Sequence, residues 1–284
     1  MVVGIKIMVF VGCRSDEGLT SKIIKLLQEA DWCECHKIEL ITSTGPLDVL
    51  YIGAFDIANN YIRLIKPDLV LCTGDRTEMA AAAQASFTNN IKIAHFYAGC
   101  MALDWSTHDD TYRHIITLLA DIALCESYEA VLNVWKLWDS IGKKGRVFIV
   151  GNSHLDDLEF DDSLVPPYAY NLVLINKATK LKEKLPDFNK ENTIIIGPNP
   201  DGEVDLEPTY RNIPRAQYLS LLKNCNKFYS NSSDVHYIAP HFLKPEQIIQ
   251  IGARNKNRQI GKIEPGASYK IVEILEEMNK DLYQ

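Results

Sequence analysis

The chain has 284 residues, of which 46% are apolar and 24% charged, and its 30 Lys and Arg against 37 Asp and Glu give a formal charge of −7. This composition is that of a globular protein, which excludes disordered, collagen-like and small disulfide-scaffold classes. The acidic balance argues against a nucleic-acid partner, because binding a nucleic-acid backbone calls for a basic surface. The length allows two domains or one large one.

The first apolar stretch predicts a buried strand, not an export signal. Residues 1–11 are apolar but run directly into Gly12-Cys13-Arg14-Ser15-Asp16, without a small-residue cleavage site. No stretch approaches the roughly 20 apolar residues that a membrane-spanning helix needs. The seven cysteines are scattered and several lie in apolar runs. We therefore expect a cytoplasmic protein with no membrane association.

Short apolar runs alternate with helix-like stretches along nearly the whole chain. Strands are expected at Ile5–Val11, Lys37–Ile41, Leu69–Cys72, Ile91–Tyr97, Ile122–Cys125, Val147–Val150, Leu172–Ile175, Ile194–Ile196, Phe228–Ser230 and Ile248–Ile251. Helices are expected at Leu19–Glu29, Ile57–Ile65, Glu78–Phe87, Tyr112–Leu119, Ala130–Trp138 and Ala216–Lys223. This alternation predicts an α/β fold with parallel strands covered on both faces.

The acidic segment Asp156–Tyr170, which contains Pro166-Pro167, separates two such alternations. It predicts two Rossmann-like halves, residues 1–155 and 156–284, that face a cleft. The second half would end in an amphipathic helix, Ala267–Leu282.

Glycines follow many of the expected strands. Loops at the ligand-binding edge of a parallel sheet must turn sharply or approach a ligand closely, so these glycines indicate where that edge lies. These glycines are Gly12, Gly45, Gly74, Gly99, Gly151, Gly197 and Gly252.

One segment brings a carboxylate to this edge. The buried strand Leu69–Cys72 is followed by Thr73-Gly74-Asp75-Arg76-Thr77-Glu78 and then by an expected helix. Asp75 can cap that helix, or it can move a proton or bind a sugar hydroxyl. The sequence alone leaves both roles open.

A second segment, His108–His114, places Asp109 and Arg113 on one helix face, four residues apart. Their side chains form either a surface ion pair or an acid and a cation presented to a ligand. His95, at the end of an apolar strand, is expected to be a structural histidine. Cys33-Glu34-Cys35-His36 has no second cluster of ligands at zinc spacing, so no metal site is expected.

Together these motifs resemble the UDP-N-acetylglucosamine 2-epimerase family, in particular its hydrolysing branch of the sialic-acid pathway. The resemblance spans nearly the whole chain. Its motifs are Gly12–Leu19, Gly74-Asp75-Arg76-x-Glu78-Met79, Ala94–Gly99, Asp109–Thr117, Val147–Asn152, Pro198–Gly202, Tyr218–Asn224, Ser230–Ser233 and Ile251–Arg254 with Arg258.

The resemblance implies a glycosyltransferase-B-type fold that binds a UDP-sugar and requires no cofactor. Members of the family remove the proton at the sugar C2, expel UDP by elimination, and then add water or re-add UDP. By position, Asp75 and Asp109 match the acid/base carboxylates, Arg14 the first-domain arginine near the diphosphate, and Ser232 and Ser233 the hydroxyls of the phosphate loop. Further substrate contacts are implied at Arg76, Tyr97, Arg113, Asn176, Asn199 and Arg254. A homodimer is implied as well.

The chain departs from the family pattern at several positions. Asn176 replaces a catalytic-site histidine and Tyr97 stands where the reversible branch carries a glutamate, while Asp234, Val235 and Ile238 follow the phosphate loop. An Asp beside a diphosphate is unfavourable unless it is protonated or turned away. Two alternatives therefore remain: a glycosyltransferase that uses the same nucleotide sugar, and a non-catalytic nucleotide-sugar binder.

Overall fold

A computed structural model describes residues 4–12, 14–40, 45–103, 108–175, 190–197, 207–211, 213–252 and 263–282. The chain forms two compact units. The first consists of residues 1–156 and 259–284, and the second of residues 157–258. Among the described residues, no helix is long and apolar enough to cross a membrane.

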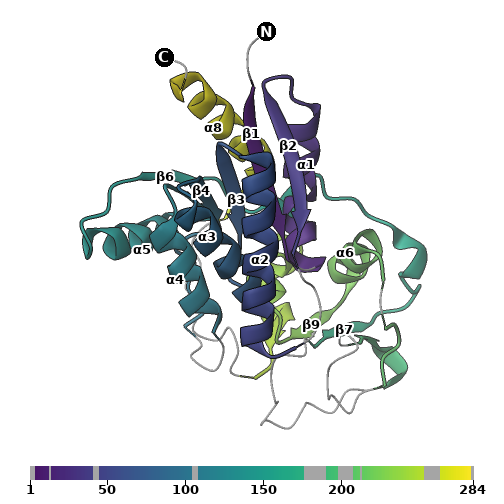
Figure 1. Cartoon of the computed structure of the whole chain (residues 1–284). Helices are drawn as coiled ribbons and strands as arrows, with labels where there is room; N and C mark the ends of the chain where they lie inside the picture. Colours follow the sequence, from purple (N-terminus) through teal and green to yellow (C-terminus); the bar gives the residue numbers. More distant parts are fainter. Residues whose placement is uncertain are drawn as a thin grey trace. The chain divides into compact units, whose positions relative to one another are not determined.

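The described part of the first unit is built on one parallel sheet of six strands in the order β2-β1-β3-β4-β5-β6 (Figure 1). Its strands are β1 (Ile5–Val11), β2 (Cys33–Glu39), β3 (Leu69–Thr73), β4 (Lys92–Phe96), β5 (Ile122–Cys125) and β6 (Arg146–Ile149). β1 has its successor β2 on one side and β3 on the other, so the strand order reverses between β1 and β3. In open parallel sheets, ligands bind outside the carboxyl ends of the strands at such a reversal.

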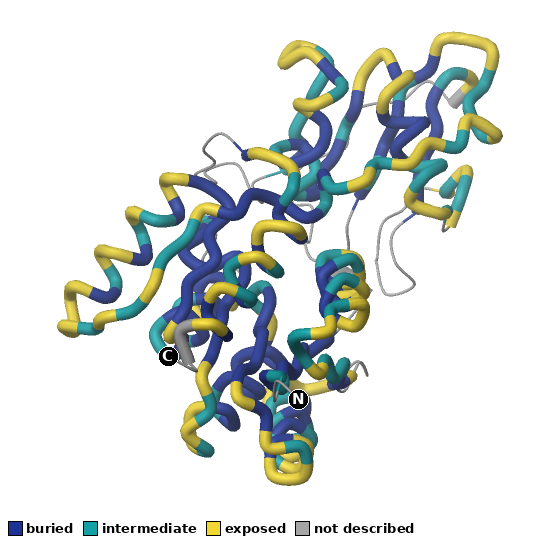
Figure 2. The backbone as a smooth tube through the Cα atoms, turned by 90° about the horizontal axis from the view of Figure 1, so that it is seen from above, coloured by how far each residue is buried: buried dark blue, intermediate teal, exposed yellow. Residues whose placement is uncertain are grey.

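Helices cover both faces of this sheet. They are α1 (Arg14–Glu29), α2 (Leu47–Ile65), α3 (Thr77–Thr88), α4 (Asp109–Leu119), α5 (Tyr128–Asp139) and α8 (Ala267–Leu282). Alternate side chains of β1 point to opposite faces: Ile7 and Val9 pack with α1, α5 and α8, whereas Met8 and Phe10 pack with α2, α3 and α4. Both faces of β1 are thus buried, which is why every residue of the strand except Lys6 is apolar. In Figure 2 the buried backbone of the chain is dark blue.

α3 lies between α2 and α4 on its face of the sheet (Figure 1). The run Ala80–Ala83 is fully buried, because alanines let the two neighbouring helices and the sheet approach closely. α4 buries a polar stripe, with Asp110, Arg113 and Thr117 all facing inward. Buried charged side chains are rare unless paired, so this stripe marks a candidate site.

The C-terminal helix belongs to the first unit, whereas its position in the sequence had suggested the second half. Ile271 and Leu275 of α8 are almost fully buried and join the core formed by Ile23 and Leu27 of α1. The apolar stripe of α8 could be recognised from the sequence, but not the surface that it covers.

The second unit has a parallel sheet in the order β10-β9-β7-β8 among its described residues. Its elements are β7 (Asn171–Leu174), β8 (Thr193–Ile196), β9 (Lys227–Ser230), β10 (Ile248–Gln250), α6 (Arg215–Asn224) and α7 (Asp234–Tyr237). Here the order reverses between β7 and β9, which places the loop after β9 at the ligand edge. Short 3₁₀ turns are η1 (Ser153–Leu155), η2 (Asp162–Leu164), η3 (Lys190–Asn192), η4 (Ala239–His241) and η5 (Pro245–Gln247).

The predicted α/β class with parallel strands is confirmed. Several helices begin earlier than expected. α4, for example, starts at Asp109 instead of Tyr112, and α2 at Leu47 instead of Ile57.

Candidate functional site

The turn between β3 and α3 holds Asp75 at the reversal point of the first sheet. Gly74 has a φ of +80°, a conformation that side-chain-bearing residues rarely adopt. Its N–H donates to the carbonyl of Phe96 on β4 (3.0 Å), which ties the turn to the neighbouring strand. Asp75 is half-buried and does not cap α3, whose first residue has no side-chain cap. The N-cap alternative for Asp75 is therefore wrong.

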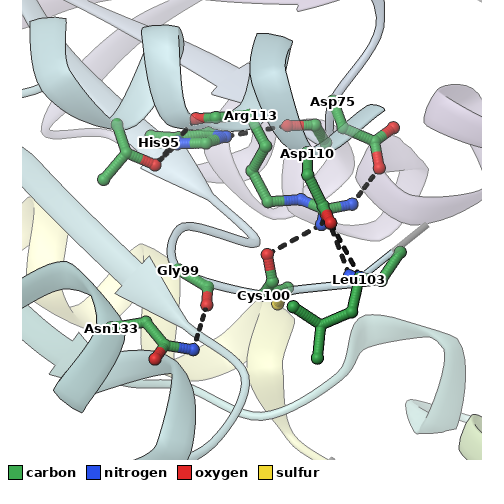
Figure 3. A network of polar contacts seen from close by, with 11 residues as sticks. Asp75, His95, Gly99, Cys100, Leu103, Asp110, Arg113 and Asn133 are labelled. Atoms are coloured by element: carbon green, nitrogen blue, oxygen red, sulfur yellow. Dashed lines mark hydrogen bonds and ion pairs between the residues drawn. The ribbon is translucent and has the colours of Figure 1, made fainter. Parts of the chain in front are cut away.

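Arg113 of α4 is the centre of a buried polar network (Figure 3). Its guanidinium donates to the carboxylates of Asp75 and Asp110, the latter at 2.9 Å, and to the carbonyl of Cys100 at 2.8 Å. The side chain of Arg113 is only 3% exposed. Arg113 was expected to contact substrate, and in the structure it contacts Asp75.

Asp110 fastens the loop after β4 to the start of α4. Its two carboxylate oxygens accept from the N–H groups of Ala102 (2.9 Å) and Leu103 (2.8 Å). The side chain is 4% exposed, and its charge is matched by Arg113. Asp110 thus has a structural role. Its neighbour Asp109, on the same helix turn, is half-buried.

His95 supports the Asp75 turn from behind. Its Nε2 lies 2.8 Å from the carbonyl of Gly74, which can only accept, so Nε2 carries the proton. Its Nδ1 lies 2.9 Å from the hydroxyl of Thr117. Burial lowers the pKa of His95 from 6.5 to about 4, so the ring is neutral at physiological pH. Both nitrogens are used, in agreement with the expected structural role.

A cavity of about 250 Å³ opens beside Asp75, at the amino-terminal end of α3. Its floor is formed by Asp75, Arg76, Thr77 and Glu78 at the junction of β3 and α3, and Asp109 also lines it. The two carboxylates proposed as an acid/base pair therefore face one hollow, although they come from different elements.

The remaining lining residues are supplied by the amino-terminal ends of α2 and α4. Leu47 and Leu50 come from α2, and His108 and Tyr112 from the start of α4. Leu47 and Leu50 could not be selected from the sequence, because α2 reaches the cavity only through its packing beside α3.

Glu78 is a buried carboxylate. It belongs to one of the motifs that resemble the family, but no role was predicted for it. Its side chain is 2% exposed, and Oε1 accepts from Arg76 at 3.0 Å. Oε2 has no hydrogen-bond partner among the described residues. The signal in the sequence that could have selected Glu78 is its position in the first turn of α3, the helix that follows β3.

Tyr97, expected to contact substrate, is buried at the end of β4 with a φ of +68°. Its hydroxyl donates to Oδ1 of Asn152 at 2.6 Å, in the loop after β6. The same oxygen accepts from the N–H of His154 at 2.8 Å. Tyr97 thus joins the ends of two strands.

In the second unit, Ser232 and Ser233 follow β9 at the reversal point of that sheet. The turn is held by Ser230, whose hydroxyl donates to Leu174 of β7 (2.6 Å) and accepts from the N–H of Ser232 (2.9 Å). Ser232 is buried and its hydroxyl accepts from the N–H of Asp234 at 3.3 Å, while Ser233 is half-buried.

The carboxylate of Asp234 is directed to α6, away from this turn. It accepts from the hydroxyl of Tyr218 at 2.8 Å. Burial raises the pKa of Asp234, opposed by the Tyr218 hydrogen bond and by the charge of Arg215. An Asp after Ser232 and Ser233 is therefore compatible with an anion at this turn, because its side chain is engaged with Tyr218.

Some expected contacts lie outside the described residues. Asn176, Asn199 and Arg254 are among them. Arg14 begins α1, next to the first sheet's reversal point, but its side chain is also outside the described part. No group of three or more His, Cys, Asp or Glu side chains in the described ranges is placed to hold a metal ion.

Comparison with known proteins identifies this arrangement. The family model for UDP-N-acetylglucosamine 2-epimerase matches residues 37–196, more than half of the chain. The chain belongs to the UDP-N-acetylglucosamine 2-epimerase family. The match includes β3, the Asp75 turn and the polar stripe of α4.

Two named relatives illustrate this epimerase family. The UDP-N-acetylglucosamine 2-epimerase of Neisseria meningitidis serogroup B is 26% identical over 70% of this chain. The GDP/UDP-N,N'-diacetylbacillosamine 2-epimerase (hydrolyzing) of Campylobacter jejuni is 25% identical over 84% of it. The chain spans 59% of the length of the first and 67% of the second.

The epimerase fold is also found in solved structures. The crystal structure of the Methanocaldococcus jannaschii UDP-GlcNAc 2-epimerase, in complex with UDP-GlcNAc and UDP, matches with a TM-score of 0.72 at 16% identity. The match covers 96% of this chain and 99% of that one. The two units thus have the glycosyltransferase-B-type fold expected from the sequence.

Proposed function

We propose that this protein releases UDP from a UDP-linked N-acetylated amino sugar by elimination, with Asp75 and Asp109 as its acid/base pair. The observation that carries the proposal is that both carboxylates line one cavity at the reversal point of the first sheet. Family membership supplies the reaction class. The hydrogen-bond acceptors proposed to bind the sugar are residues of the first unit. The residues proposed to contact the diphosphate include Ser232 and Ser233.

The reaction needs two proton movements. One group takes the proton from C2, the C–H electron pair forms a C1=C2 double bond, and the C1–O bond breaks so that its electrons leave with UDP. Water then adds its hydroxyl group to C1 while C2 receives a proton on the opposite face, which gives the free 2-epimeric sugar. Two carboxylates that come from different structural elements and line one cavity can carry out these two proton transfers.

Arg113 supports the proposal by its contact with Asp75. A buried guanidinium holds the carboxylate in one orientation. Asp109 lies on the first turn of the same helix, so α4 connects both members of the pair.

A UDP-release assay tests the proposal. The purified chain is incubated with UDP-N-acetylglucosamine and with UDP-N,N'-diacetylbacillosamine, without any sugar acceptor. We expect UDP and a free sugar from at least one of them, and a kcat lower by roughly 100-fold or more in Asp75→Asn and Asp109→Asn. Asp48→Asn, an exposed change on α2, is the matched control and should keep wild-type activity.

The alternatives give different results in the same assay. A glycosyltransferase would release UDP only after an acceptor is added. A non-catalytic binder would be stabilised by the nucleotide sugar but would release no UDP. Either result, or full activity in Asp75→Asn, would contradict the proposal.

The proposal extends to the protein's assembly and location. A homodimer is supported by the apolar side chains that α2 exposes, among them Val49, Ile52 and Leu64. Light scattering should then give twice the chain mass of 32.1 kDa. A cytoplasmic location is supported by free cysteines, such as Cys72 and Cys125, in the described core.

A further inference from the structure

Glu78 is a buried carboxylate that lines the same cavity as Asp75 and Asp109. Its side chain is 2% exposed, whereas that of its ion-pair partner Arg76 is 46% exposed. Taking a carboxylate out of water is costly unless both of its oxygens find hydrogen-bond donors. Arg76 supplies one donor, to Oε1 at 3.0 Å. This contact compensates the burial of one carboxylate oxygen of Glu78 and leaves the other to be explained.

The second oxygen of Glu78, Oε2, is buried and finds no hydrogen-bond partner in the part of the chain that the structure describes. The same is true, within the described ranges, of the hydroxyl of Thr77, the preceding residue on α3. Buried polar atoms without a partner are costly and rare, so each one calls for an explanation. Both residues line the cavity, where a bound ligand can supply the missing contacts.

Glu78 also lies at the reversal point of the first sheet. A Cβ atom placed on Gly12, the residue after β1, would lie 3.8 Å from the Cβ of Glu78. Glu78 itself belongs to the first turn of α3, which follows β3. Its side chain is therefore found where the ends of β1 and β3 meet. Ligands of open parallel sheets bind outside this point, so the position of Glu78 supports a binding role independently of its missing partner.

We propose that Glu78 is a substrate-binding residue, in which Oε2 accepts a hydrogen bond from a hydroxyl or amide N–H group of the sugar. The hydroxyl of Thr77 makes a second contact with the sugar. Arg76 fixes the carboxylate by its contact with Oε1, which leaves Oε2 for the ligand. An ionised carboxylate only accepts hydrogen bonds, so it binds a donor and repels the phosphates of the nucleotide. This inference rests on the proposed function, because it adds a residue to the sugar site of that reaction.

A purely structural role for Glu78 would depend on Oε1 alone, the oxygen that contacts Arg76. Glu78→Gln separates the two roles. Arg76 is a donor, so the amide oxygen of the glutamine keeps this contact, and the amide NH₂ group takes the place of Oε2. A donor of the sugar then faces another donor. Losing a hydrogen bond to a charged acceptor weakens binding by roughly 10- to 100-fold.

The test compares calorimetric Kd values for UDP and for a UDP-sugar. All variants carry Asp109→Asn, which slows the proposed reaction. The UDP-sugar is the one that is turned over in the UDP-release assay, or UDP-N-acetylglucosamine if neither is. Glu78→Gln should raise the Kd of the UDP-sugar by roughly 10- to 100-fold, and Thr77→Val by about 3- to 10-fold. The Kd of UDP should stay unchanged in both variants, because UDP lacks the sugar.

Glu129→Gln is the matched control. Glu129 is the second residue of α5, as Glu78 is of α3, but its side chain is exposed. Its replacement should change neither Kd. Thr77→Val should leave the ligand-free protein as stable as before, because valine has the same shape as threonine. If Glu78→Gln does not fold, Thr77→Val decides the inference by the same comparison of the two ligands.

An unchanged Kd of the UDP-sugar in Glu78→Gln, or an equal rise in the Kd of UDP, would overturn the inference. The proposed function would then stand as long as the wild type releases UDP. Weaker binding of the UDP-sugar alone in Glu78→Gln, in a protein that releases no UDP, would uphold the inference and contradict the proposed function. If the protein binds no UDP-sugar at all, both fail.

Discussion

Arg113 of α4 donates to Asp75, the residue that follows the β3 turn glycine. The two residues are 38 positions apart in the sequence, so their contact joins α4 to the end of β3. Because the Arg113 side chain is buried, its charge is compensated by Asp75 and Asp110 together. The contact therefore orients the proposed acid/base carboxylate and also stabilises the fold.

Replacing Arg113 should destabilise the protein strongly. Arg113→Met leaves two buried or half-buried carboxylates without their counter-charge, and breaking a buried pair in this way costs about 3–5 kcal/mol of the free energy of unfolding. Urea denaturation measures the loss. Arg63→Met, an exposed arginine on α2, should change stability by less than about 0.5 kcal/mol. Similar losses in both variants would show that the network contributes little.

His95 should make the protein less stable in acid. Its pKa in the folded state is about 4, lower than the ordinary 6.5, because burial disfavours the charged ring. Between these values the unfolded chain binds a proton that the folded chain does not. The contribution of His95 is therefore complete above pH 6.5 and is lost as the pH falls through about 4, by a total of about 3 kcal/mol.

Urea denaturation at several pH values isolates this contribution. The stability difference between the wild type and His95→Gln should shrink as the pH falls from 7 to 4. His241→Gln, an exposed change in the second unit, should give a difference that stays constant. A constant difference for His95→Gln as well would contradict the neutral, buried ring.

Asp234→Asn should stabilise the protein at neutral pH. Burial raises the pKa of Asp234, so its charged form is disfavoured in the folded state relative to the unfolded one. The stability gained by the Asp234→Asn variant should disappear as the pH falls through the raised pKa of Asp234. Below that pH the wild-type Asp234 is itself protonated, so the wild type no longer carries the cost of a buried charge. Glu246→Gln, exposed in the same unit, is the control for a general effect of charge. A loss of stability in Asp234→Asn at pH 7 would show that the charged form is favoured.

Tyr218→Phe should have the opposite effect. It removes the hydroxyl that donates to Asp234 and leaves the carboxylate without that partner, which costs about 1–2 kcal/mol. Thermal unfolding of the single variants and of the Tyr218→Phe/Asp234→Asn pair measures their coupling. Strict additivity would contradict the contact.

Asp156 should be needed to hold the C-terminal helix. Its carboxylate accepts from the N–H groups of Gly266, Ala267 (3.2 Å) and Ser268 (2.7 Å) at the start of α8. Asp156→Ala should cost about 1–2 kcal/mol, as the loss of a helix cap does, and should speed amide hydrogen exchange in α8. Glu276→Gln, in an exposed ion pair of the same helix, should do neither. Unchanged exchange in Asp156→Ala would contradict this role.

Local patterns were enough to predict most of the strands and the position of Asp75. The exception is β2, which was expected at Lys37–Ile41 and lies at Cys33–Glu39. The apolar run before Gly74 fixed β3, and with it the place of Asp75 at the ligand edge of the sheet. The inward face of α4 was harder to predict. Its sequence suggested an Asp109–Arg113 pair, whereas Arg113 pairs with Asp110 and with Asp75 of a different element.

What could not be predicted depends on contacts between distant segments. Leu47 and Leu50 line the cavity beside Asp75, and their position follows from the packing of α2 beside α3. The return of α8 to the first unit depends on a core shared with α1. Neither contact leaves a local signal, because the same apolar stripes would fit other surfaces.

The central claim is that a proton leaves the sugar C2 while UDP departs, and turnover in deuterium oxide tests it most directly. The released sugar is examined by mass spectrometry and NMR. The account predicts that it carries deuterium at C2, and that Asp75→Asn and Asp109→Asn lose UDP release and deuterium incorporation together. Release of UDP with the C2 hydrogen retained would contradict it.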